Sequence, residues 1–177
     1  MKLNQLFIAA AVSSALLSTS ALALSDNTIT FKGAVADQTC TVTINGNEVA
    51  PVVLLPTARA ADLAISGATD KDTTFDLGIS NCTVSEDDVT VSTVFVGNNV
   101  TDAGRLGNTG TANNVDIQLL NTTGTPINLT GGYTSPDLLL PAGDTEASAT
   151  YTARYYATGA ATVGTVQASL QYAVTYP

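Results

Sequence analysis

The stretch TVQASLQYAVTYP, residues 165–177, is the clearest indication of the fold class of this chain. Apolar side chains recur at every second position from Val166 to Tyr176, the pattern of a strand with one buried face. The sequence ends there without supplying a next strand. An unpaired strand edge tends to pair with another segment. Two interpretations therefore remain open: a domain that is complete by itself, or a subunit that assembles with another chain.

The remaining sequence has the same two-residue periodicity and shows no convincing helical stripe. Short apolar runs alternate with turns rich in Gly, Asn, Asp and Pro. The runs cover residues 29–35, 40–44, 49–55, 75–79, 89–96, 115–119, 127–129, 151–156 and 166–176. Residues 56–67 have some helical character but are expected to form a loop, and residues 104–114 a mobile surface loop. This organisation predicts an all-β sandwich of two antiparallel sheets.

The N-terminus has the features of a secretory signal peptide. Lys2 precedes an apolar run over residues 6–17, and a small-residue stretch then ends at Ala23. The apolar run is too short to span a hydrocarbon core of about 30 Å, and no later segment is long enough to be a membrane span. We therefore expect residues 1–23 to be removed, with cleavage after Ala21 as an alternative, leaving about one domain.

The charge of the chain is strongly acidic, at −9 for the full sequence. Removing residues 1–23, which contain one lysine and no acidic residue, makes it −10. This charge argues against nucleic-acid binding, which needs a basic surface. Solubility is its simplest role, although an acidic surface could also attract a basic partner.

The two cysteines, Cys40 and Cys82, are expected to form one structural disulfide in an exported chain. A bridge closing a loop of roughly forty residues would stabilise the fold by about 4 kcal/mol. A redox role is the less favoured alternative. The chain has no histidine, and two cysteines without a CxxC spacing are too few ligands for a metal site, so no metal or cofactor is expected.

Catalytic motifs are also lacking, because the commonest general base, histidine, does not occur. The acidic run at residues 86–88 is better interpreted as a solvated turn than as a glycosidase acid–base pair or a calcium loop. The glycines of residues 104–114 have neither the lysine nor the strand–helix setting of a phosphate-binding loop. We therefore predict that the protein is not an enzyme and has no catalytic residues.

The two ends of the mature chain carry matching strand patterns. Near the front, one face of an extended segment would present Asn27, Ile29, Phe31, Gly33 and Val35. Near the back, the corresponding face would present Val166, Ala168, Leu170, Tyr172, Val174 and Tyr176. Either pattern alone is that of an ordinary strand. Their position at opposite ends of the chain is what distinguishes the pair.

The conjunction of these features resembles the pilins of chaperone–usher pili, in particular the major rod subunits of type 1 fimbriae. The resemblance rests on FKG at residues 31–33, on Cys40 and Cys82, on ARYYATGAATVG at residues 153–164 ending in Gly164, and on the penultimate Tyr176. Two details differ slightly from many rod subunits. Only nine residues precede Gly33 if cleavage follows Ala23, and the chain closes on Pro177.

The resemblance implies an immunoglobulin-like β-sandwich lacking its seventh strand and completed by donor-strand complementation. Residues 24–36 would form the N-terminal donor extension and residues 37–177 the incomplete domain. Asn27, Ile29, Phe31, Gly33 and Val35 would insert into a neighbouring subunit. The acceptor groove and chaperone-binding strand would contain Gly164, Val166, Ala168, Leu170, Tyr172, Val174 and Tyr176.

The implied function is that of a structural subunit polymerising head-to-tail into a fimbria on the cell surface and supporting adhesion. Its partners would be other copies of itself or related pilins, a periplasmic chaperone and an outer-membrane usher. The alternative is a secreted single-domain adhesin, or a minor pilus subunit, with its own carbohydrate-binding site. The absence of tryptophan and the scarcity of aromatic residues weaken that alternative.

Overall fold

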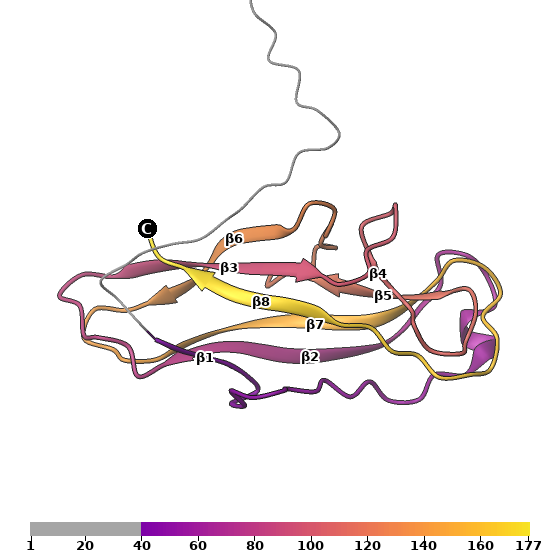
Figure 1. Ribbon diagram of the computed structural model, residues 1–177, viewed down its shortest axis with the longest axis horizontal. Coiled ribbons are helices and arrows are strands. Elements are labelled where there is room, and N and C mark those ends of the chain that lie inside the picture. Colours follow the sequence, from indigo (N-terminus) through magenta and orange to yellow (C-terminus); the bar gives the residue numbers. More distant parts are fainter. Residues whose placement is uncertain (1–39) are drawn as a thin grey trace, which may run out of the picture. The chain divides into compact units, whose positions relative to one another are not determined.

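The computed structural model describes residues 40–177, which form two stacked antiparallel sheets (Figure 1). The first sheet has the strand order β1-β2-β7-β5-β4, and the second has the order β6-β3-β8. The strands are β1 (Thr41–Ile44), β2 (Thr69–Ser80), β3 (Val89–Gly97), β4 (Leu106–Gly107), β5 (Val115–Leu120), β6 (Tyr133–Leu140), β7 (Ala147–Ala157) and β8 (Leu170–Thr175). The predicted all-β class and the two-sheet arrangement are confirmed.

The core lies between the two sheets and follows from the alternation within each strand. In the long pair β2–β7, Phe75 lies opposite Tyr151 and Leu77 opposite Ala149, and all four are buried. Their neighbours along the strands, such as Asp76 and Thr150, face outward, and the Thr150 hydroxyl donates to Asp76 Oδ1 at 2.6 Å. Because successive side chains point to opposite faces, two-residue patterning places the apolar set inside.

Several predicted elements differ from the observed ones. Residues 127–129 are not a strand but follow an isolated bridge between Leu120 and Pro126. Residues 49 and 50 form a bend, and residues 51–55 are extended but belong to neither sheet. Residues 56–67 contain one short 3-10 helix, η1 (Ala60–Leu63), within the expected loop. Strand β8 covers only the second half of the predicted run, because residues 165–169 lie outside the sheet.

Strand β6 has no counterpart among the predicted runs. It contains Pro136, which lacks a backbone N–H and therefore argues against a strand in a sheet interior. The structure accommodates this proline because β6 is an edge strand that pairs with β3 alone. The pairing shifts register between Val91 and Thr93, so that two residues of β6, Pro136 and Asp137, oppose Ser92.

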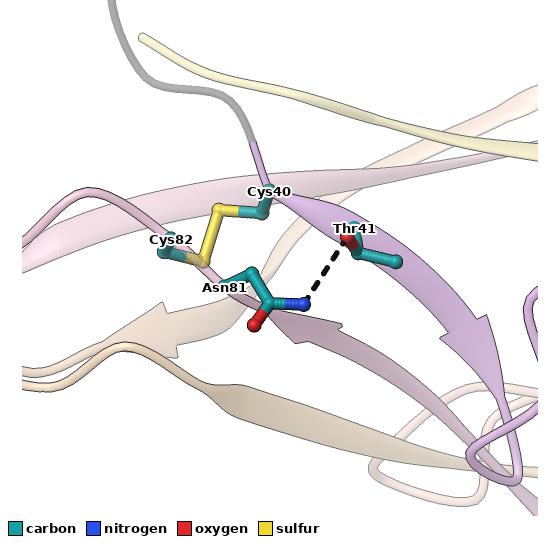
Figure 2. The surroundings of a disulfide bond; sticks show 4 residues. All are labelled: Cys40, Thr41, Asn81 and Cys82. Carbon is teal, nitrogen blue, oxygen red and sulfur yellow. Dashed lines mark hydrogen bonds between the residues drawn. A yellow bond between two sulfur atoms is a disulfide. The ribbon is translucent and has the colours of Figure 1, made fainter.

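The disulfide between Cys40 and Cys82 joins the start of β1 to the segment just after β2, at a sequence separation of 42 (Figure 2). Next to it, the Asn81 amide donates to Thr41 Oγ1 at 3.4 Å, as Figure 2 shows. The bridge secures the edge strand β1, which has only four residues. The predicted disulfide is therefore present.

Candidate functional site: an apolar groove

An open groove of about 530 Å³ lies along one side of the sandwich, between residues 51–55 and the segment that leads into β8. Its floor consists of core side chains from both sheets, and its walls are two extended segments. The floor residues are Ile44, Phe75, Phe95, Leu106, Ile117, Leu119, Ala153 and Tyr155, and the walls are residues 51–55 and 166–170 together with Tyr172. The groove therefore exposes the edge of the hydrophobic core.

The first wall, residues 51–55, is held by side chains rather than by its backbone. Val53 and Leu55 pack against the core, whereas Val52 and Leu54 point outward and are 79% and 84% exposed. Within the part of the chain that the structure describes, the backbone of these five residues makes no hydrogen bond. An extended segment whose N–H and C=O groups are unpaired is a ready partner for another strand.

The second wall is bonded on one side only. Strand β8 pairs with β3, and the residues before it are tied to the loop at residues 108–112. Thr109 N–H donates to Gln167 O at 2.8 Å, and Gln167 N–H donates to Asn108 Oδ1 at 2.8 Å. Val166 and Ala168 make no backbone hydrogen bond to any residue in the range 40–177. Because backbone groups of alternate residues point to opposite edges of a strand, those of Val166 and Ala168 point to the groove side.

Two glycines allow the loop to approach this wall closely. A Cβ on Gly164 would lie 2.7 Å from both Ala112 Cα and Thr111 C, and one on Gly110 would lie 2.6 Å from Thr165 C. Contacts of that length with backbone atoms are not tolerated, so any larger residue would push the segments apart. The loop at residues 108–112, part of the glycine-rich stretch expected to be mobile, is therefore anchored to the groove wall by hydrogen bonds.

The structure places six of the seven predicted acceptor residues on one face. These six are half-buried and pack against the core, and their intervening neighbours at residues 167, 169, 171 and 173 are exposed. The six are Val166, Ala168, Leu170, Tyr172, Val174 and Tyr176. Four of the six line the groove (Val166, Ala168, Leu170 and Tyr172), whereas Val174 and Tyr176 lie outside it. The seventh, Gly164, is also outside the groove: it is exposed and lies against the 108–112 loop. The role of these residues in accepting a strand stays a prediction.

Tyr176 closes the end of this face beside the disulfide. Its hydroxyl is buried without a hydrogen bond to the described residues. Burial raises the pKa of Tyr176 above its ordinary value, and the nearby Cys40 backbone acts in the opposite direction. The penultimate tyrosine thus packs where β1 begins.

The predicted donor residues Asn27, Ile29, Phe31, Gly33 and Val35 lie outside the described residues. The opposite wall of the groove was missed as part of a site, because residues 49–55 were interpreted as an ordinary strand. One signal could have identified it. Residues 52–55 are apolar at every position between Pro51 and Pro56, a pattern that alternation on a half-buried sheet does not require.

The acidic turn at residues 86–88, considered above as a possible catalytic pair or calcium loop, lies at the surface. The acidic residues 86–88 are exposed in the turn before β3, where Asp88 Oδ1 accepts a hydrogen bond from Ala142 N–H at 2.8 Å. Within residues 40–177, no three His, Cys, Asp or Glu side chains gather as metal ligands would. Over the same residues, no helix has the length and apolarity needed to cross a membrane.

Comparison with known proteins assigns the chain to a family. Residues 29–177 match the family described as fimbrial protein. The chain is 38% identical over 162 residues to the major fimbrial subunit SMF-1 of Stenotrophomonas maltophilia, covering 85% of this chain and 92% of that protein. It is 32% identical to the type-1 fimbrial protein A chain of Escherichia coli K12, covering 99% of this chain and 100% of that protein.

Solved structures show the same fold. The P pilus rod subunit PapA superimposes with a TM-score of 0.58 at 17% identity, covering 77% of this chain and 99% of PapA. A subunit of a chaperone–usher pilus superimposes with a TM-score of 0.60 at 19% identity, covering 86% of this chain and 96% of that one. Both likenesses support the immunoglobulin-like β-sandwich fold of this chain. The chain therefore belongs to the fimbrial protein family, the structural, non-enzymatic pilins that assemble with other subunits into surface fimbriae.

Proposed function

We propose that this chain is the repeated rod subunit of a fimbria, and that residues 24–36 of one copy fill the groove of the next. The observation that carries the proposal is the groove itself. Both of its walls have unbonded backbone groups, and its floor is apolar core. A single extended strand inserted between residues 51–55 and 166–170 would pair with both walls and cover the floor.

The donor segment has the side chains that such a groove needs. Ile29, Phe31 and Val35 would each contribute roughly 1.5 to 3 kcal/mol if fully buried, before the costs of ordering. Each ladder hydrogen bond would add about 0.5 to 1.5 kcal/mol. Gly33 lies among these residues and suits a point where the inserted backbone approaches the groove too closely for a side chain.

Head-to-tail insertion explains why the product would be a fibre. Donor and acceptor are different surfaces of the same subunit, so the contact does not close on itself as a two-fold contact does. Before assembly, the groove would expose core side chains and unpaired edges, which favour aggregation. A periplasmic chaperone that covers the groove and an outer-membrane usher that orders the exchange would prevent this, following export directed by residues 1–23.

Deletion of residues 24–35 tests this function. The shortened chain keeps its groove and loses its donor, so it should bind a synthetic peptide of residues 24–36 in a one-to-one complex and form no fibre. A peptide with the same composition in scrambled order is the control and should not bind. Fibres from the deleted chain, or equal binding of both peptides, would refute donor-strand assembly.

A further inference from the structure

A cluster of buried polar atoms lies between the two sheets, beneath the groove. Tyr151 and Thr93 are both 0% exposed. The Tyr151 hydroxyl, Thr93 Oγ1 and Asp137 Oδ1 are all buried, and none makes a hydrogen bond of good geometry within the described chain. Thr93 and Asp137 nevertheless lie close enough to the Tyr151 hydroxyl to influence its ionisation. Three such atoms in one place call for an explanation, because leaving a buried polar group unpaired is costly.

The β-bulge of β6 accounts for the carboxylate in this position. At the start of β6, Tyr133 faces inward and stacks on Phe95. At its end, Leu138 and Leu140 are the buried residues. The inward-facing positions therefore change from odd-numbered to even-numbered residues between 133 and 138. Asp137 occupies the bulge, where its Oδ2 accepts a long hydrogen bond from the Tyr133 hydroxyl at 3.4 Å. Bulges commonly redirect a side chain in this way.

The ring of Tyr151 connects this cluster to the groove. It stacks on Phe75 with a centroid distance of 5.7 Å and an interplanar angle of 26°. It meets Phe95 edge-on at 4.9 Å and 76°. Phe75 and Phe95 both belong to the groove floor, whereas Tyr151 does not line the groove. The tilt of the Tyr151 ring therefore determines how the two phenylalanine rings lie beneath an inserted side chain.

We propose that Tyr151 is a positioning residue for the donor strand: its ring, which packs on Phe75 and Phe95, supports the aromatic floor of the groove, and its buried hydroxyl beside Thr93 and Asp137 sets the tilt of that ring. The inference rests on the proposed function and identifies what shapes the same groove from below. Burial raises the pKa of Tyr151, so its hydroxyl stays protonated and able to donate toward the Asp137 carboxylate. Phenylalanine at this position would retain the ring but lose the connection.

The test is a double-mutant cycle in fimbriae assembled from the full chain. The variants are Tyr151→Phe, each of Ile29→Val, Phe31→Leu and Val35→Ala, and the three combinations. Subunit release in guanidinium chloride is followed by non-reducing, unheated gel electrophoresis. Tyr151→Phe should accelerate release between about two- and tenfold, the range expected for loss of one buried polar contact. This acceleration should shrink when it is combined with the donor residue that rests on the floor.

Control variants separate positioning from general stability. Tyr156→Phe removes a hydroxyl from the same strand, at a position whose ring lies under the Arg105 guanidinium at 3.9 Å and does not line the groove, so release should be unchanged. If Tyr151→Phe does not assemble, Asp137→Asn takes its place in the same cycle. An unchanged release rate, or additive effects with all three donor changes, would overturn the inference. Failure of the wild-type chain to form fimbriae would instead count against the proposed function.

Discussion

Replacing Gly164 by alanine should destabilise the subunit by disturbing one wall of the groove. The added Cβ would lie 2.7 Å from Ala112 Cα, so the 108–112 loop and the wall must separate. Separation would weaken three hydrogen bonds: Ala112 N–H to Thr165 O at 3.0 Å, Thr111 N–H to Thr165 Oγ1 at 3.1 Å, and Thr165 N–H to Thr111 Oγ1 at 2.9 Å. Overpacking of this kind costs about 1 to 3 kcal/mol, and losing the three bonds would cost a comparable amount.

The expected loss is therefore roughly 2 to 4 kcal/mol in the free energy of unfolding, depending on how many of the three bonds are lost. It can be measured by guanidinium unfolding of the purified chain followed by far-ultraviolet circular dichroism, at an unchanged denaturant dependence. Gly159→Ala is the matched control, because its Cβ would meet only the Asn114 side chain, at 3.4 Å or more. If Gly164→Ala and Gly159→Ala unfolded at the same denaturant concentration as the wild type, the argument from close approach would be wrong.

Four further changes test other parts of the account. Leu170→Asp places a charge on the core-facing side of β8 and should abolish assembled fimbriae on the cell surface; normal amounts by electron microscopy would contradict this. Gly33→Leu should stop a subunit from donating its strand while leaving it able to bind a donor peptide, and normal fibre growth would count against the assignment. Removing the disulfide by Cys40→Ala with Cys82→Ala should cost about 4 kcal/mol in denaturant unfolding, and an unchanged midpoint would contradict this. Because burial raises the pKa of Tyr151, the unfolded chain loses this proton above about pH 10 while the folded chain retains it; stability should therefore fall above that pH, less steeply in Tyr151→Phe.

The fold class could be predicted because the strands have one buried face. Alternation at Phe75, Leu77 and Ile79, and again along residues 166–176, gives the strand type and the inward face without tertiary information. The disulfide followed from having two cysteines in an exported chain. The alternating pattern lies within a few neighbouring residues, and the disulfide required only that two cysteines were present.

The groove walls could not be predicted in the same way. Whether residues 49–55 pair with a neighbour depends on a partner strand, which no local pattern reports, and residues 51–55 proved to be extended but unpaired. Gly164 was predicted as a groove residue, but its contact with Ala112 depends on a loop that lies far from it in sequence. Strand β6 was not predicted because it contains Pro136, and a strand tolerates a proline only at a sheet edge. That β6 lies at an edge is known only from the sheet topology.

The most direct test of head-to-tail assembly is the state of the chain on the cell surface. Material sheared from cells expressing it with a chaperone and an usher would be viewed by negative-stain microscopy and run on a non-reducing gel without heating. Donor-strand assembly predicts fibres and an SDS-resistant ladder of subunit multiples that collapses to monomer on heating. Soluble monomer alone under these conditions would contradict the account.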